Sequence, residues 1–311
     1  MPEAPPIQVH EVGLRDGLQM EKQVVPRAIK LKWAEALLRS GVDVVQVGSF
    51  VHPEKVPQMA DTDALFEALA ARGAALPGGG VLLSALVLNE KGLERALRCP
   101  VHMVCMGVSG SETHSRRNTG MGITEATSRV IQMAWRARDA RRRVQVSVQS
   151  AFGCGYEGDV PVERVLGIVR TFQDAGLDRI SLADTAGHAT PESVERLYGE
   201  VRSLAPSAEL ACHFHDTYGL ALAKCYAALR AGVVSFEGSV AGLGGCPFTA
   251  VAGGNTCTED FVHALQRSGR RTDVDLGVLI DVAREVAGFL GRDLPGAVYK
   301  VGPVAQPQEV C

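Results

Sequence analysis

The sequence of 311 residues lacks the features of membrane and nucleic-acid-binding proteins. No apolar run approaches the ~18 residues of a membrane-spanning helix, so we expect no association with a membrane. The first ten residues, MPEAPPIQVH, contain neither the basic segment nor the apolar core of a secretory signal, so a cytoplasmic protein is expected. A net charge of −3 provides no excess of lysine and arginine for nucleic-acid binding.

Several short motifs are absent as well. The chain has eight cysteines, but no two have the Cys-x-x-Cys spacing of a zinc ribbon or a redox pair. Most of them lie in apolar segments, which favours reduced thiols over a disulfide framework. No Gly-x-Gly-x-x-Gly fingerprint follows a predicted strand, and the chain has no phosphate-binding P-loop. A dinucleotide-binding protein is therefore not indicated.

Short apolar runs alternate with longer segments of helical periodicity. In 161–175 the apolar residues recur at intervals of three and four, as on one face of a helix. In 191–204 the same pattern follows Thr190-Pro191, an N-cap and a first-turn proline. Eight strand–helix units indicate a (β/α)8 TIM barrel, with a doubly wound sheet as the alternative. The expected strands are Ile7–Val12, Val42–Val47, Val81–Leu88, Val101–Met106, Val144–Gln149, Asp178–Ala183, Leu210–His213 and Val233–Glu237.

No linker or low-complexity segment divides the chain, so we expect a single catalytic domain over residues 1–311. Its barrel is predicted to span about residues 7–270, with a last helix near 257–266. An additional C-terminal helical segment is predicted over about 271–311, because 275–291 has the pattern of one more helix.

Polar residues gather where the predicted strands end. In a barrel of this type the chemistry lies at the carboxyl ends of the strands, which all open on one face. A random surface would not place polar groups at the same end of strands far apart in sequence. The segments concerned are Glu11–Gln19, Gln46–Phe50, Asp184-Thr185, His213–Asp216 and Gly242–Asn255.

Four of these residues form a candidate metal site. His213 and His215 are two residues apart, so on a strand both imidazoles face the same side. Asp16 follows the first strand, which neighbours the last strand in a closed barrel, and Asn255 offers an amide oxygen. Nitrogen and oxygen ligands with open positions suit Mg²⁺ or Mn²⁺, whereas Zn²⁺ or Co²⁺ stays possible.

Two further residues could act beside a metal. Arg15 would place a fixed cation next to it and could stabilise a developing enolate, unless it forms an ion pair with Glu11 or Asp16. Cys246 lies in a loop with three glycines, whose movement could bring the thiol over the barrel mouth as a general acid or base. The alternative for Cys246 is a buried, inert thiol.

At these residues the chain resembles the 3-hydroxy-3-methylglutaryl-CoA lyase family, over roughly residues 7–290. The resemblance implies that Asp16, His213, His215 and Asn255 are metal ligands, that Arg15 stabilises an enolate and that Cys246 is a mobile-loop cysteine. It also places Glu11, Asp184 and Glu259 at catalytic or second-layer positions. The matching motifs are EVGLRDGLQMEK (11–22), VGSFVHPEKVPQMAD (47–61), CHFHDTYGLALA (212–223) and VAGLGGCPFTAVAGGNTCTED (240–260), supported by FGCGYEG (152–158).

The resemblance implies a metal-dependent retro-Claisen cleavage of 3-hydroxy-3-methylglutaryl-CoA to acetyl-CoA and acetoacetate. His213 or Asp16 would take the hydroxyl proton, and Arg15, Gln46, Ser49 and Gly245 would contact the acyl-CoA thioester. A homodimer or a higher homo-oligomer is expected by resemblance.

One departure leaves the substrate open, because Gln46 stands where the family has glutamate. A neutral amide in place of an anion would change the acceptors near Arg15 and the metal. The substrate could then be citramalyl-CoA or a 3-hydroxy-3-alkylglutaryl-CoA. Two further hypotheses are a Claisen-type synthase that joins acetyl-CoA to a 2-oxo acid, and a barrel that only binds a thioester.

Overall fold

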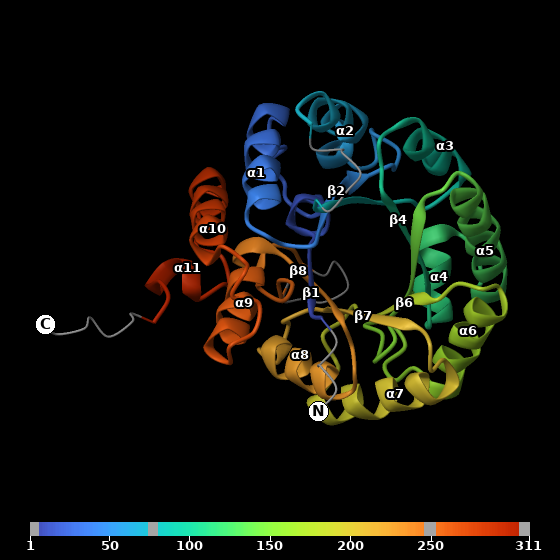
Figure 1. Cartoon of the computed structure of the whole chain (residues 1–311). Helices are drawn as coiled ribbons and strands as arrows, with labels where there is room; N and C mark the ends of the chain where they lie inside the picture. Colours follow the sequence, from blue (N-terminus) through green and yellow to red (C-terminus); the bar gives the residue numbers. More distant parts are fainter. Residues whose placement is uncertain (1–5, 74–79, 246–252, 305–311) are drawn as a thin grey trace, which may run out of the picture.

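The computed structural model describes residues 6–73, 80–245 and 253–304. Within these ranges eight parallel strands form a closed barrel in chain order, and the last strand pairs with the first (Figure 1). The barrel confirms the expected fold, and the doubly wound alternative is wrong. The strands are β1 (Gln8–Glu11), β2 (Val44–Ser49), β3 (Leu82–Leu86), β4 (Met103–Ser109), β5 (Arg143–Gln149), β6 (Arg179–Asp184), β7 (Glu209–Phe214) and β8 (Ser235–Gly238).

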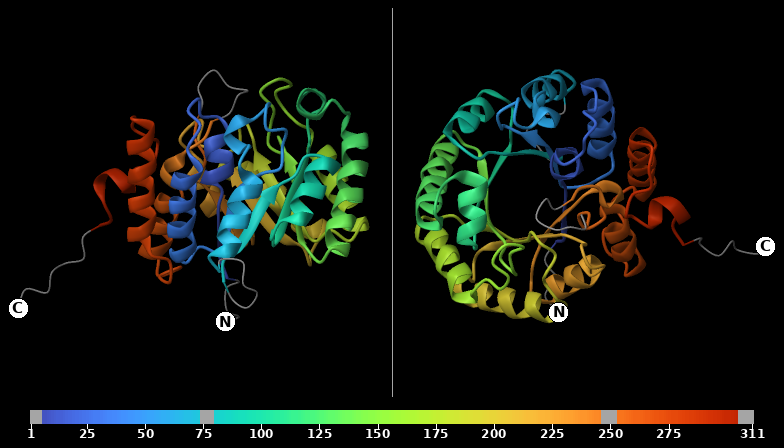
Figure 2. Two further views of the ribbon diagram at one scale, coloured as in Figure 1. Left: turned by 90° about the horizontal axis from the view of Figure 1, so that it is seen from above. Right: turned by 180° about the vertical axis from the view of Figure 1, so that it is seen from behind.

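Helices form an outer ring around the strands, as the view from behind shows (Figure 2). Among the described residues no helix is both long enough and apolar enough to cross a bilayer. The ring contains α1 (Arg27–Arg39), α2 (Thr62–Ala71), α3 (Glu90–Arg98), α4 (Glu112–Thr119), α5 (Ile123–Asp139), α6 (Val162–Asp174), α7 (Pro191–Leu204) and α8 (Ala221–Arg230). Shorter turns are η1 (Gly13–Gly17), η2 (Pro57–Met59) and η3 (Val240–Gly242).

In the described residues after the eighth strand there are three more helices: α9 (Thr258–Arg267), α10 (Leu276–Leu290) and α11 (Val298–Val301). They lie together on one side of the barrel, where α10 packs against α1 and η3 (Figure 1). The expected helices near 257–266 and 275–291 correspond to α9 and α10. Thr190 caps α7 as predicted, since its hydroxyl accepts the Ser193 N–H at 3.3 Å.

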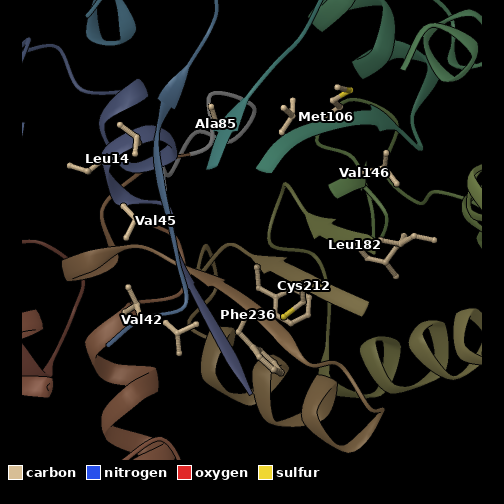
Figure 3. Close-up of a cluster of buried hydrophobic side chains, with 14 of the residues drawn as sticks. Leu14, Val42, Val45, Ala85, Met106, Val146, Leu182, Cys212 and Phe236 are labelled. Carbon is tan, nitrogen blue, oxygen red and sulfur yellow. The ribbon is translucent and has the colours of Figure 1, made fainter. Parts of the chain in front are cut away.

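The alternation of strand residues separates two environments. Outward positions such as Val146, Leu182 and Phe236 pack against the helices in the main hydrophobic core (Figure 3). Burial of each such side chain contributes roughly 1.5–3 kcal/mol. Inward positions are polar on several strands, as with Gln145 on β5 and Glu237 on β8. The apolar layer therefore holds the helices in place, while the barrel interior carries groups capable of chemistry.

The predicted strand ends differ from the observed ones by a few residues. β2 continues to Ser49 and β4 to Ser109, beyond the predicted ends at Val47 and Met106. Ser109 is still paired with Gln149 in the neighbouring strand, so the pairing between β4 and β5 continues beyond the last apolar residues of β4. Backbone pairing, and not side-chain polarity, determines where these strands end.

Candidate metal centre and active site

The turn η1 carries Arg15 and Asp16 and is held in place by Glu11, the last residue of β1. One oxygen of the buried Glu11 carboxyl accepts the N–H groups of Gly13 at 2.7 Å and Val240 at 3.1 Å. The other oxygen accepts the hydroxyl of Thr258. Burial raises the pKa of Glu11 to about 7, although these hydrogen bonds oppose the shift. Glu11 thus joins the end of β1 to the end of β8 and the start of α9.

Asp16 lies at the meeting point of β1, β7 and β8. Its Oδ2 is 2.9 Å from Asn255 Nδ2 and 3.7 Å from His213 Nε2. Its Oδ1 accepts a hydrogen bond from Arg15. Burial would raise the pKa of Asp16, but the neighbouring Arg15 guanidinium, assisted by His213 and the hydrogen bond from Asn255, outweighs burial and holds this pKa below its usual range. Asp16 therefore supplies an ionised carboxylate.

His213 and His215 face the same side at the end of β7, as their spacing predicts. Their Nε2 atoms are 3.2 Å apart. Phe214 between them points to the other side and packs against Phe152, with ring centroids 5.9 Å apart. Burial, followed by the neighbouring His213, lowers the pKa of His215 to about 4, so this imidazole is neutral and offers a lone pair.

Asn255 completes the group with an unpaired oxygen. Its Nδ2 donates to Asp16 and, at 3.1 Å, to the carbonyl oxygen of Leu243. These two bonds fix the amide orientation and leave the buried Oδ1 with no hydrogen-bond partner among the described residues. Gly254 allows this arrangement, because a side chain there would collide with the carbonyl oxygen of Gly242.

This donor set fits a divalent cation. Ligand atoms of Asp16, His213 and His215 lie within 4.8 Å of one another, and the unpaired Asn255 oxygen belongs to a residue that contacts Asp16. One anionic oxygen, two imidazole nitrogens and one amide oxygen are a suitable donor set for Mg²⁺ or Mn²⁺. A buried polar oxygen without a partner costs free energy, and a bound cation would remove that cost.

Arg15 is held beside this group by two neighbours. Its Nε donates to the amide oxygen of Gln46, and its Nη1 donates to Asp16. Of the two ion-pair partners considered from the sequence, the structure pairs Arg15 with Asp16 and not with Glu11. Because Gln46 is neutral, Asp16 is the carboxylate that partly offsets the guanidinium charge at this place.

A cavity of about 210 Å³ opens above these residues. Arg15, Asp16, His213 and His215 line one side, together with Gln46 and Gly245. Apolar side chains from the end of β3, the residues just after it and β4 line another side, and hydroxyl and amide groups from β5, β6 and the residue after β6 line a third. Those two walls comprise Leu86, Leu88 and Met106, and Gln145, Ser147, Gln149, Ser181 and Thr185.

Ser49 does not line this cavity within the described part of the chain. Its hydroxyl donates to the carbonyl oxygen of Leu86 at 3.3 Å, and the side chain is buried. Conversely, His114 and Asn118 of α4 line the cavity and were not predicted from the sequence. They are four residues apart on one helix face, which is the pattern that could have identified them.

The carboxyl groups of Asp184 and Glu259 form ion pairs or hydrogen bonds with other groups of the protein. Asp184 forms a fully buried ion pair with Lys224 at 2.6 Å, and Lys224 also donates to the backbone oxygen of His215 at 2.7 Å. Both oxygens of Glu259 lie 3.0 Å from the N–H of Ala241, and burial raises the pKa of Glu259 to about 8. Neither carboxyl lines the cavity in the part of the chain described, and the catalytic or second-layer roles expected for them stay predictions.

Cys246 lies outside the described residues, as does Cys311, so their expected roles stay predictions. The six described cysteines are buried and free, in keeping with the reduced thiols expected from the sequence. Sequence reasoning missed Glu237, which accepts a hydrogen bond from His213 Nδ1 at 2.8 Å. Polar residues alternate along β5 and β8, and in a barrel such alternating positions point inward, so the sequence could have indicated that Glu237 faces the interior.

Comparisons with known proteins agree with this arrangement. The HMGL-like family matches residues 6–286. A 3-hydroxy-3-isohexenylglutaryl-CoA/hydroxy-methylglutaryl-CoA lyase of Pseudomonas aeruginosa is 39% identical over 92% of this chain and 93% of its own. An (R)-citramalyl-CoA lyase of Chloroflexus aurantiacus is 35% identical, with 98% and 97% covered. An HMG-CoA lyase from Acenitobacter baumannii, solved with coenzyme A and 3-methylmalate, superposes with a TM-score of 0.89 at 31% identity and 98% coverage of both chains.

Proposed function

The chain belongs to the HMGL-like family, and from that premise we propose that it is a divalent-metal-dependent carbon–carbon lyase acting on an acyl-CoA thioester. The proposed substrate is 3-hydroxy-3-methylglutaryl-CoA or a close analogue. Retro-Claisen cleavage would break the C2–C3 bond and yield acetyl-CoA and acetoacetate. The observation that carries the proposal is the grouping of Asp16, His213 and His215 next to the unpaired Asn255 oxygen.

Asp16, His213, His215 and Asn255 would hold the cation, with Mg²⁺ and Mn²⁺ as the proposed metals. When bound, the cation supplies Lewis-acid polarisation of the substrate hydroxyl and of a nearby carboxylate oxygen. Cleavage needs a base for the hydroxyl proton, and Asp16, acting through a water, is the candidate at this edge of the cavity, because His213 would have Nε2 on the cation and Nδ1 hydrogen-bonded to Glu237.

Arg15 would stabilise the charge that develops on the thioester oxygen as the C2–C3 bond breaks. Its guanidinium lines the cavity beside Asp16 and is fixed by Gln46, so it is preorganised for an enolate oxygen. The acetyl-CoA enolate then takes a proton on carbon. Cys246, which the sequence places in the glycine-rich loop after β8, is the proposed donor.

The test is release of acetyl-CoA from 3-hydroxy-3-methylglutaryl-CoA with Mg²⁺ or Mn²⁺ under reducing conditions. We expect turnover that stops with a chelator and returns with added metal. The Cys246→Ala variant should lose most of its kcat. Metal-independent turnover would contradict the metal role, and full kcat in Cys246→Ala would contradict the proton-donor role. No release from this thioester would shift the proposal to citramalyl-CoA or a larger analogue.

A second candidate keeps the mechanism and changes the substrate. Leu86, Leu88 and Met106 form an apolar wall that could receive a C3 substituent larger than methyl, and Gln46 presents a neutral amide next to Arg15. Citramalyl-CoA and a 3-hydroxy-3-alkylglutaryl-CoA should therefore be assayed beside the first thioester. A higher kcat/KM for either would reassign the substrate. We also propose a homo-oligomer, for which light scattering on the purified protein is the direct test.

A further inference from the structure

We propose that Glu237 is a positioning residue of the candidate metal centre, and that it acts through a chain of oriented hydrogen bonds across the barrel interior. The chain begins at Arg179, passes through Gln145 to Glu237 and ends at His213. Its effect is to hold the imidazole proton of His213 on Nδ1, so that Nε2 offers its lone pair to a cation. This inference rests on the metal site of the proposed function.

The orientation is fixed at Arg179, a residue buried inside the barrel. Its Nε lies 3.0 Å from Gln145 Oε1, and its Nη2 lies 3.0 Å from both Gln8 Oε1 and Ser235 Oγ. Its Nη1 pairs with Glu209. A guanidinium can only donate hydrogen bonds, so the atom of Gln145 that faces it must be the amide oxygen. The rotation of the Gln145 amide is thereby determined.

The same logic continues to Glu237. With its oxygen on Arg179, Gln145 turns its Nε2 towards Glu237 and donates to Oε1. The second oxygen, Oε2, lies 2.8 Å from His213 Nδ1. An ionised carboxylate accepts hydrogen bonds and donates none, so the His213 Nδ1 atom must carry the proton. The other imidazole nearby, His10, is more distant, with its Nδ1 3.8 Å from Glu237 Oε1.

The second ring nitrogen of His213, Nε2, faces the candidate metal site. His213 Nε2 lies 3.2 Å from His215 Nε2 and 3.7 Å from Asp16 Oδ2. A neutral imidazole with its proton on Nδ1 has its lone pair on Nε2, which is the form a metal requires. A carboxylate on the outer nitrogen of a ligating histidine fixes the ring orientation and raises its basicity.

The network can hold this orientation because it is buried. Arg179, Gln145 and Glu237 all point into the barrel from β6, β5 and β8, and each is at most 7% exposed. Arg179 and Glu237 both hydrogen-bond to Gln145, so losing either would leave one end of that buried amide without its partner.

Glu237→Gln tests this chain most directly. It keeps the size of the side chain but replaces the oxygen that accepts from His213 Nδ1 with an NH2 group that donates. Gln145 still donates, so the new amide turns its oxygen to Gln145 and its NH2 group to His213 Nδ1. The imidazole proton is then expected to move to Nε2, where it blocks the cation. We expect the Mn²⁺ dissociation constant, measured by electron paramagnetic resonance of free Mn²⁺, to rise by about 10–100-fold.

The tautomer itself supplies a readout that needs neither metal nor substrate. In metal-free protein labelled with 15N-histidine, at about pH 9 where imidazoles are neutral, the His213 signal should report Nδ1–H in the wild type. Glu237→Gln should report Nε2–H, and Glu237→Asp should retain Nδ1–H. The spectrum of His213→Asn identifies the signal. Glu195→Gln, an exposed residue of α7, serves as the matched control and should change nothing.

Two results would overturn the inference. One is a Glu237→Gln variant that binds Mn²⁺ within about twofold of the wild type and keeps Nδ1–H. The other is Nε2–H in the unaltered protein, a result that decides the matter even if Glu237→Gln does not fold. Failure of every thioester assay with the tautomer as expected would refute the proposed substrate alone. An active lyase with the opposite tautomer would refute the role of Glu237 alone.

Discussion

Two sets of polar side chains, both at the carboxyl ends of the barrel strands and mostly buried, differ in how far the surrounding protein already occupies their ligand atoms. In the open set, Asp16, His213, His215 and Asn255, ligand atoms face one another and one amide oxygen has no partner among the described residues. In the engaged set, Glu11, Asp184 and Glu259, at least one oxygen of each carboxyl is occupied by backbone N–H groups, a hydroxyl or Lys224, and Asp184 Oδ1 alone of the six oxygens has no partner among the described residues.

The comparison teaches that a residue's role depends on which of its atoms the fold already uses. Asp16 and Glu11 are five residues apart, and Asn255 and Glu259 are four apart, yet one of each pair faces the metal site and the other supports it. We infer that the open set binds the metal and that the engaged set fixes the turns η1 and η3 and the backbone of His215. The following changes should separate the two sets.

The largest effect is expected for His215→Ala, which removes an open ligand. Loss of several kcal/mol of metal-assisted stabilisation should lower kcat/KM by about 10³-fold or more. The measurement is acetyl-CoA release at saturating Mn²⁺, with circular dichroism to verify the fold. Activity within tenfold of the wild type would remove His215 from the open set.

Lys224→Met should act on stability, because it leaves the Asp184 carboxylate buried without its cation. Breaking a buried pair from one side costs about 3–5 kcal/mol in the free energy of unfolding. Urea denaturation measures this loss, and the double variant with Asp184→Asn should recover part of it. A cost below about 1 kcal/mol would show that the pair does not hold the end of β7.

Arg15→Lys keeps the charge and loses the planar fork that donates to both Gln46 and Asp16. We expect kcat to fall by about 10²–10³-fold, as for loss of one preorganised donor, while Mn²⁺ still binds. Steady-state kinetics beside a Mn²⁺ titration distinguishes the two. An unchanged kcat would exclude Arg15 from stabilising the enolate.

Glu259→Gln should change how stability depends on pH. Burial raises the pKa of Glu259 from 4.5 to about 8 in the folded protein, so its stabilising contribution is present below pH 4.5 and is lost as the pH rises through about 8. The variant should therefore reduce the decline in unfolding free energy between pH 5 and pH 9 by about 4 kcal/mol. The decline due to Glu11, whose pKa is also raised, should persist. Identical pH profiles would contradict the assignment.

Much of the fold could be predicted because local signals agree with one another. Runs of β-branched residues define strands covered on both faces, and Thr190-Pro191 marks the start of α7. The strand ends at Ser49 and Ser109 could not be predicted, because they depend on hydrogen bonds to neighbouring strands. No local pattern reports those partners.

The candidate site was predictable to the extent that it follows strand geometry. The spacing of His213 and His215 shows that they share one side, and barrel closure brings Asp16 to them. The partners were not predictable, since Arg15 meets Gln46 and His213 meets Glu237 through contacts between distant segments. Strand alternation indicates that Glu237 points inward, but it does not tell which side chain it meets.

The most direct test of the distinction between the two sets is one Mn²⁺ titration, followed by electron paramagnetic resonance, of wild type, Asp16→Asn and Glu259→Gln side by side. Wild type and Glu259→Gln are predicted to bind a single Mn²⁺ with the same affinity. Asp16→Asn is predicted to bind it more than about 100-fold more weakly, because it loses the anionic ligand. Unchanged binding by Asp16→Asn, or an equal loss in Glu259→Gln, would contradict the account.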